Sequence, residues 1–276
     1  MRGLHSQEVA LARTSGVRPR IGGVALVGWV ILRASGVARA DHGMMMSGTD
    51  HATSEITAGL AVEAAGYSNA LYVGTYQGVT PSLGWMYGRF GTTAAISLYH
   101  VDENGRSVRG LGDAMLGAHA IVVATDSLEV GAGLHLMLPT GSEPDNLGMG
   151  HAMAIPSAWL AWRARPLTVT ASAGYGRALV ALGGTQHVHG AGPLVDPMNL
   201  QELTWSAGAE VDVGHGVQLG ARTSGAAPLG AGQLRAICGG RVAWATPRVT
   251  TGFELSAGVA GDPFTVRGVV ETTLRF

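Results

Sequence analysis

An alternation of apolar and polar residues with a period of two constrains this chain more than any other feature of its sequence. In the segment 128–138 every even-numbered residue is Leu, Val or Ala, whereas Glu129 and His135 stand at odd positions. Successive side chains of a β-strand point to opposite faces, so this period indicates strands with one apolar and one polar face. Helical spacing of apolar residues is scarce, and the 43 glycines are too many for long stable helices. The sequence therefore predicts an all-β fold.

The breaks between the alternating runs are short and long in turn. Short breaks fall near 89–91, 124–126, 165–166, 214–216 and 246–248, and long ones cover roughly 68–79, 102–110, 139–150, 180–199, 225–232 and 260–263. An even number of strands joined alternately by short turns and long loops is typical of a transmembrane antiparallel up-and-down β-barrel. The runs between the breaks predict 12 strands, near 55–67, 80–89, 92–101, 111–123, 127–138, 151–163, 167–179, 200–213, 217–224, 233–245, 249–259 and 264–276.

A secreted β-sandwich also alternates, but two features favour the barrel. Aromatic residues gather at strand ends, where the two interfaces of a membrane would lie: Tyr87, Trp162, Trp244 and Phe276 near the short turns, and Tyr99, Tyr175, Trp205 and Phe264 near the long loops. The last strand is amphipathic and ends in Phe276, which resembles the signal that the barrel-assembly machinery recognises in outer-membrane proteins. The expected partners are therefore this machinery, outer-membrane lipid and lipopolysaccharide.

The N-terminal 40 residues have the layout of a secretory signal peptide. Four arginines within residues 1–20 precede an apolar stretch over 21–32, and Ala38-Arg39-Ala40 supplies the small residues of a cleavage site. This stretch is too short for a membrane anchor, which needs about 20 residues. We expect cleavage after Ala40, a flexible His- and Met-rich segment over 41–54, and a barrel over 55–276 in the outer membrane of a Gram-negative bacterium.

Composition excludes several other classes of protein. A chain with 46% hydrophobic and 13% charged residues is not intrinsically disordered. The single cysteine, Cys238, excludes a disulfide scaffold and a multi-cysteine metal site. A net charge of −1 gives no basic surface for nucleic acid. Glycine motifs in a nucleotide-binding context are absent, so no cofactor is expected.

A family resemblance covers about residues 80–165. Gly110-Leu111-Gly112-Asp113 opens a pair of alternating strands that ends in Leu138-Pro139-Thr140-Gly141, and Leu147-Gly148-Met149-Gly150 follows. This arrangement resembles the "MetA-pathway of phenol degradation" outer-membrane family, whose members look like barrels of comparable length and are described as transporters. The resemblance implies transport of a small solute, with aromatic or hydrophobic compounds as one possibility.

If the apolar positions face lipid, charged residues of both signs face the interior of the barrel. Two interpretations stay open: the charges pair across a narrow lumen as a polar core, or they line an aqueous path. The candidate lumen-lining residues are Glu63, Asp113, Glu129, Glu210, Glu254, Arg222, Arg235 and Arg241.

Histidine and methionine cluster outside the regular alternation. Imidazole and thioether groups together suit soft ions such as Cu(I) or Ag(I), although Met also fills apolar gaps and His is common in loops. The candidate metal ligands are His42, Met44, Met45, Met46 and His51 near the expected mature N-terminus, and Met149, His151 and Met153 in a long loop.

These features together predict a channel or transporter for passive or facilitated diffusion of small solutes. The first alternative is a structural or copper-binding surface barrel with a closed lumen. An outer-membrane hydrolase is a further alternative. Its candidate catalytic pairs are Ser142 with His151 and Asp145 with His187. No Gly-x-Ser-x-Gly motif occurs, so we do not expect an enzyme.

Overall fold

The computed structural model describes residues 54–68, 73–179, 198–230, 232–261 and 264–276. It consists of antiparallel strands: β1 (Ser54–Ser68), β2 (Val73–Tyr87), β3 (Phe90–Ala95), β4 (Leu98–Glu103), β5 (Arg106–Leu111), β6 (Ala114–Ala124), β7 (Leu128–Leu138), β8 (Met153–Ala164), β9 (Leu167–Ala178), β10 (Gln201–Gly214), β11 (Val217–Pro228), β12 (Arg235–Ala245), β13 (Val249–Ala260) and β14 (Val266–Arg275). A single 3₁₀ turn, η1 (Glu143–Asp145), lies between β7 and β8. The described residues contain no helix of the length and apolarity needed to span a membrane.

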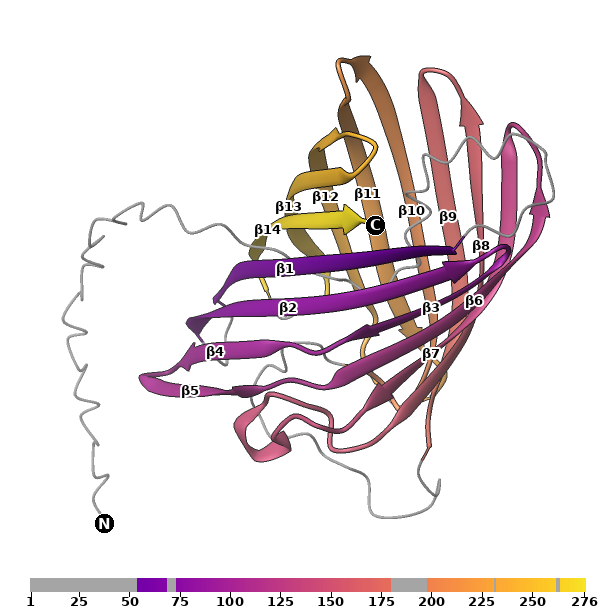
Figure 1. The fold of residues 1–276 in the computed structure, drawn as a ribbon. Coiled ribbons are helices and arrows are strands. Elements are labelled where there is room, and N and C mark those ends of the chain that lie inside the picture. The colour runs from indigo at the N-terminus through magenta and orange to yellow at the C-terminus, as the bar shows by residue number, and fades with distance from the viewer. Residues whose placement is uncertain (1–53, 69–72, 180–197, 231, 262–263) are drawn as a thin grey trace, which may run out of the picture.

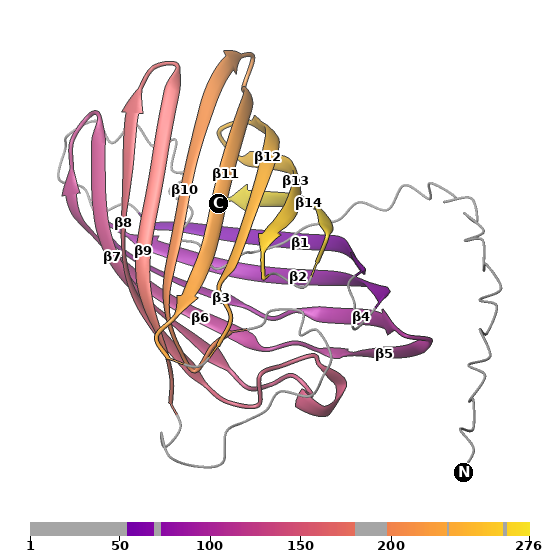
Figure 2. The ribbon, with the colours of Figure 1, turned by 180° about the vertical axis from the view of Figure 1, so that it is seen from behind.

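The strands close into a barrel along whose wall the chain runs 12 times, as predicted. Each passage from one end of the wall to the other is here called a crossing, and two of the crossings are each divided into two strands. β1 pairs with both β2 and β14, and every other strand pairs with its neighbours in antiparallel register (Figures 1 and 2). β3 and β4 are two halves of one crossing, since both pair with β2, and β5 and β6 form the next crossing in the same way. This closure leaves no free sheet edge between β1 and β14.

A proline explains the interruption between β3 and β4. Residues on either side of the break keep the same register against β2, which places Ile96 opposite Pro81. The amide of Ile96 donates to the carbonyl of Pro81 at 3.4 Å, but Pro81 has no N–H to return the bond. The ladder is therefore broken at this point although the crossing continues.

Apolar side chains face outward and charged ones face the interior. Leu134 on β7 is 41% exposed and Leu255 on β13 is 52% exposed, whereas Glu63 on β1 is 0% exposed and Arg241 on β12 is 4% exposed. Alternate residues of a barrel strand point out of and into the barrel. The barrel is thus apolar outside and charged inside, the reverse of a water-soluble protein.

Three of the predicted loops are shorter than expected. β2 begins at Val73, inside the predicted loop 68–79; β4 and β5 meet in a tight turn at Asn104-Gly105, inside 102–110; and β11 continues to Pro228, inside 225–232. The polar outward residues Thr75 and Gln77 make this segment resemble a loop in sequence. Tyr76 between them is nevertheless buried on the inner face, and β1 pairs along the whole length of β2. Most of the predicted loop 180–199 lies outside the described residues.

The predicted aromatic belt is found at one end of the barrel and only partly at the other. Near the short turns, Tyr87, Trp162 and Trp244 are exposed on the outer face. Near the long loops, Tyr99 and Phe264 are each 4% exposed and belong to a core inside the barrel. Phe264 precedes β14, so the alternation of that strand does not govern its direction.

Candidate functional site

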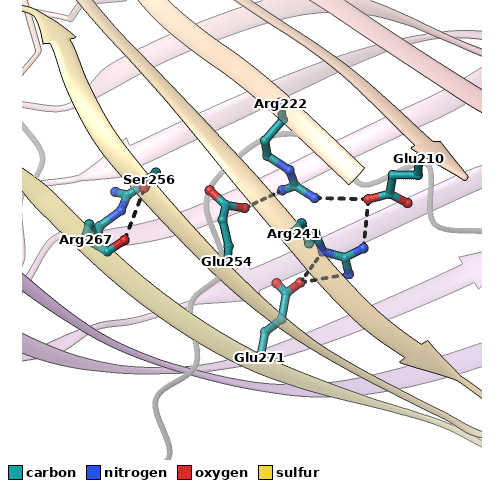
Figure 3. Close-up of polar contacts among 7 residues, drawn as sticks. All are labelled: Glu210, Arg222, Arg241, Glu254, Ser256, Arg267 and Glu271. Carbon is teal, nitrogen blue, oxygen red and sulfur yellow. Dashed lines mark hydrogen bonds and ion pairs between the residues drawn. The ribbon is translucent and has the colours of Figure 1, made fainter. Parts of the chain in front are cut away.

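A continuous chain of four ion pairs lies on the inner wall across β10 to β14 (Figure 3). Arg222 on β11 lies 3.2 Å from Glu254 and 3.5 Å from Glu210. Arg241 on β12 lies 2.8 Å from the same Glu210 and 3.1 Å from Glu271. Five successive strands each contribute one residue, and the charges alternate in sign along the path. We call these five residues the ion-pair chain.

Glycines on neighbouring strands make room for these long side chains. Gly220 is the cross-strand neighbour of both Glu210 and Arg241, and Gly252 is that of Glu271. A Cβ at Gly252 would lie 2.9 Å from Nη2 of Arg241 and 3.1 Å from Oε1 of Glu271, and one at Gly220 would lie 2.7 Å from Cγ of Glu210. Part of the glycine content therefore serves to keep the inner wall clear where charged side chains cross it.

The two arginines of the ion-pair chain differ in their access to water. The side chain of Arg241 is 2% exposed, and its guanidinium donates to Glu210 through Nη1 and to Glu271 through Nε and Nη2. A buried charge is costly unless it is paired and hydrogen-bonded. The planar guanidinium of arginine has several N–H donors, so it can pair with two carboxylates at the same time. Arg222 is 35% exposed, so it also faces open space in the barrel.

Three further ion pairs extend the charged lining. Arg235 on β12 lies 2.8 Å from Glu202 on β10, near the long-loop end, and Glu202 also accepts hydrogen bonds from the backbone and side-chain nitrogens of Asn199. The other two pairs are near the short turns: Arg163 with Glu129, and Arg275 with Glu55 at 3.9 Å. Each of these pairs joins strands that are adjacent or one strand apart, so the partners lie on the same wall and not across the lumen.

The candidate lumen residues divide into two groups. Six of them contribute to ion pairs on the inner wall: Glu129, Glu210, Glu254, Arg222, Arg235 and Arg241. Glu271, which pairs with Arg241, also lies at a position that the alternation of its strand predicts to face inward. The partners Glu202 and Arg163 were not among the candidates. Glu202 has the same parity as Glu210 on β10, so the alternation alone could have identified it.

Glu63, the seventh candidate, lies in a tyrosine-rich core at the long-loop end. The hydroxyl of Tyr76 donates to Oε2 of Glu63 at 3.4 Å. The ring of Tyr76 meets that of Tyr99 edge-on, with 6.1 Å between the centroids. The guanidinium of Arg267 lies 4.7 Å from the centroid of the Phe264 ring. This core also contains Ala65, Tyr67, Val101 and Leu147, and it fills part of the barrel with side chains.

Asp113, the eighth candidate, fastens the loop between β7 and β8. Its carboxylate accepts hydrogen bonds from the amides of Gly141 at 3.0 Å and Met149 at 2.8 Å. Thr140 adds a second link, since its hydroxyl donates to the carbonyl of Gly112 and accepts from the amide of Ala114. The short motifs around residues 110–113, 138–141 and 147–150 therefore act together as one structural unit.

The same loop buries its apolar residues against the interior of the barrel. Leu147 packs in the core with Tyr76 and Tyr99. Met149 and Met153 form a second buried cluster with Ala178, against which Met137, Met198 and Leu200 pack. The loop therefore fills part of the barrel at this end.

Five of the candidate metal ligands lie outside the described residues, and the other three are buried at the end of the β7–β8 loop and the start of β8. His42, Met44, Met45, Met46 and His51 belong to the segment that is not described, and Met149, His151 and Met153 are almost fully buried. Within the described ranges, no group of three or more His, Cys, Asp or Glu side chains could hold a metal ion. Loop packing accounts for the position of Met149 and Met153.

The candidate hydrolytic pairs make other contacts. The hydroxyl of Ser142 donates to Asp145 at 2.8 Å, and Asp145 forms an ion pair with Arg106. These contacts fasten η1 to the β4–β5 turn. His187, the other member of the second pair, lies outside the described residues.

The wall opposite the ion-pair chain is lined by small residues and histidines. In the ring of 12 crossings, β12 and the crossing that contains β6 are six steps apart in either direction. Two cross-strand rows on that wall read Met86–Gly91–His119–Gly133 and Gly84–Thr93–Gly117–His135. The ion-pair chain therefore faces a wall on which these two rows carry small neutral residues, imidazoles and one thioether.

Solved structures with a similar fold are outer-membrane barrels. The crystal structure of the COG4313 outer membrane channel from Pseudomonas putida F1 matches with a TM-score of 0.62 and 12% identity, over 82% of this chain and 96% of that one. The KdgM porin in complex with disordered oligogalacturonate matches with a TM-score of 0.52 and 7% identity, over 81% and 99%. At such identities the likeness shows the fold, which is a porin-like closed barrel.

Comparison of sequences adds no closer assignment. No family model matches the chain, and no curated protein is detectably similar to it in sequence. The resemblance to the MetA-pathway family is therefore not confirmed.

Proposed function

We propose that the protein is a channel of the Gram-negative outer membrane that lets small solutes cross by passive or facilitated diffusion. The observation that carries this proposal is the closed barrel with an apolar exterior and the ion-pair chain on its inner wall. An apolar exterior is stable in lipid, and the partly exposed charged side chains inside are stable in contact with water. The likeness in fold to an outer membrane channel and to a porin supports the same function.

The expected contacts with the membrane follow from the outer surface. Exposed leucines such as Leu134 and Leu255 would contact lipid chains, and Tyr87, Trp162 and Trp244 would lie at one interface. The long loops stand at the other end, where lipopolysaccharide is the expected partner. Cleavage of a signal peptide after Ala40 belongs to this proposal and concerns residues outside the described part of the chain.

The lining of the barrel favours a small polar solute. The ion-pair chain combines three carboxylates and two guanidinium groups, so it has both signs of charge and a small negative excess. Such a wall interacts well with polar or zwitterionic molecules. Transport of aromatic or hydrophobic compounds rests on the family resemblance alone.

A second candidate function is a barrel whose lumen is closed. The specific observation in its favour is the packing of Leu147 against Tyr76 and Tyr99 inside the long-loop end. With Asp113 and Arg106 as its anchors, the loop between β7 and β8 fills part of the lumen there. A barrel of this kind would serve as a structural protein or as a channel that opens when the loop is released.

Single-channel recording in a planar bilayer tests both candidates. We expect discrete current steps from the folded wild-type protein, which would establish a water-filled path. If the wild type is silent, the variant Asp113→Ala distinguishes a closed channel from a structural barrel. It removes the carboxylate that accepts hydrogen bonds from the amides of Gly141 and Met149 and so releases the loop. Current from that variant alone would indicate a channel closed by the loop. Silence from both folded proteins would contradict the channel proposal and favour a structural barrel.

A further inference from the structure

We infer that Met86 and His119 form a binding site for a soft monovalent cation, Cu(I) or Ag(I), on the inner wall of the barrel. Nε2 of His119 lies 3.1 Å from Sδ of Met86. The two residues belong to different crossings, β6 and β2, and meet across β3, which runs between them. This site is distinct from the candidate metal ligands in the N-terminal segment and the β7–β8 loop, and its existence does not depend on conduction.

A glycine between the two side chains allows them to meet. Gly91 on β3 is the cross-strand neighbour of both Met86 and His119. A Cβ at this position would clash with Sδ of Met86 and with Cε1 of His119. Any other residue at position 91 would therefore separate the imidazole from the thioether. The contact depends on a backbone position that carries no side chain.

The chemistry of the two donors selects the ion. Thioethers bind soft ions such as Cu(I) and add little to the binding of Zn²⁺, Mg²⁺ or Ca²⁺, whereas a neutral imidazole nitrogen suits Cu(I) as well. An ion bonded to both atoms lies between them and therefore holds them further apart than 3.1 Å. Rotation within the flexible side chain of Met86 provides that change.

A nearby carboxylate adds negative charge to the site. Glu55 on β1 is the direct cross-strand neighbour of Met86 and is 8% exposed. Nε of Arg275 lies 3.9 Å from Oε1 of Glu55, which is within ion-pair distance but longer than a hydrogen bond. The charge favours a cation next to the thioether.

Similar donors continue along the same wall towards the long-loop end. His135 faces Gly117 one row beyond His119, and Met115 faces Met137 in the following row. Met137 in turn pairs with Met153 on β8. Histidines and methionines therefore recur at successive inward positions of β6 and β7, with Met86 and His119 as the pair that is already in contact.

Competition for Ag(I) and Cu(I) tests the site in the folded, detergent-solubilised full-length protein. The wild type and Met86→Leu are each titrated with Ag(I), and with Cu(I) against a chromogenic Cu(I) chelator. Leucine fills the same space without the sulfur, so folding is retained, and band shift on unheated gels confirms it. We expect the variant to lose one tightly bound ion, or to bind it at least tenfold more weakly.

Two further variants separate this site from other ligands in the chain. Gly91→Ala keeps both donors but separates them, and it should reproduce the loss seen with Met86→Leu. His100→Gln is the matched control: His100 lies on β4 in contact with Ser107 and Asp102, away from Met86. It should leave binding unchanged. Ions bound by the N-terminal His and Met residues are retained in all variants.

The inference would be overturned by unchanged stoichiometry and affinity in both Met86→Leu and Gly91→Ala. It would also be overturned if Zn²⁺ displaced Ag(I) from the wild type at equal concentration, because a site built on a thioether discriminates against Zn²⁺. Since binding is measured without a bilayer, silence in conductance recordings would not affect this result. A failure of the channel proposal and a failure of the metal site are therefore distinguishable.

Discussion

At the scale of single residues, the two arginines of the ion-pair chain have separate tasks. Arg241 is enclosed by Glu210 and Glu271 and almost fully buried, whereas about a third of the Arg222 side chain is open to the interior. Burial makes the pairing of Arg241 a condition of stability, because its loss takes one counter-charge away from both Glu210 and Glu271. Because the side chain of Arg222 is exposed to the interior, its charge influences which ions and solutes the interior attracts.

Replacement of Arg241 by Met should therefore destabilise the barrel. We expect a loss of about 3 kcal/mol or more in the free energy of unfolding, as for other broken buried ion pairs. Urea unfolding in detergent or lipid, followed by loss of the band shift on unheated gels, measures the change. Arg222→Met serves as the comparison and should cost clearly less. Equal losses in the two variants would contradict the separate tasks.

Replacement of Arg222 should instead alter ion selectivity. Arg222→Met increases the negative excess of the ion-pair chain by one charge, and Glu254→Gln reduces it by one. In a salt gradient across a planar bilayer, the reversal potential should shift towards cation selectivity in the first variant and towards anion selectivity in the second. Shifts in the same direction in both variants would show that these charges do not line the conducting path.

At the scale of the elements, strands whose alternation is unbroken could be predicted almost to the residue. The predicted range 127–138 became β7 (Leu128–Leu138), and 249–259 became β13 (Val249–Ala260). The first half of β2 was missed because its outward residues Thr75 and Gln77 are polar. The alternation describes a strand only where its outer face is apolar, so strand segments beyond the apolar belt resemble loops in sequence.

The outer face of β7 provides a direct test of this assignment. Leu134→Arg places a charge on the apolar exterior and should cost roughly 2–4 kcal/mol if the residue lies near the middle of the bilayer. The matched control is Thr75→Arg on the outer face of β2, beyond the apolar belt, which should cost about 0–1 kcal/mol. Refolding into lipid vesicles under increasing urea measures both. A wild-type midpoint for Leu134→Arg would show that β7 does not face lipid there.

At the scale of the whole molecule, closure joins the first and last strands of the chain. Phe276 continues the pairing of β14, since its amide donates to the carbonyl of Ile56 at 2.9 Å, and its side chain is 74% exposed on the outside. The number of crossings and their direction could be read from the sequence. The partners within the ion-pair chain could not, because the register of each strand pair decides which charged residues meet.

The role proposed for Phe276 can be separated from its place in the closed barrel. Removal of Phe276 should lower the amount of barrel assembled in cell outer membranes, while refolding of the purified chain in detergent stays near the wild-type yield. Phe253→Ala, which removes another exposed aromatic side chain from β13, is the control and should assemble normally. Normal assembly in cells without Phe276 would contradict recognition of this residue by the assembly machinery.

The confinement of the ion-pair chain to five neighbouring strands has a consequence for anything that enters the barrel. The ion-pair chain stands on one wall, and glycine, threonine and imidazole stand on the wall that faces it. The net negative charge of the chain would give the electric field between these two walls a component directed across the lumen. Water and dipolar solutes would be turned to a preferred orientation as they cross, so the barrel would discriminate among molecules by the direction of their dipoles as well as by size.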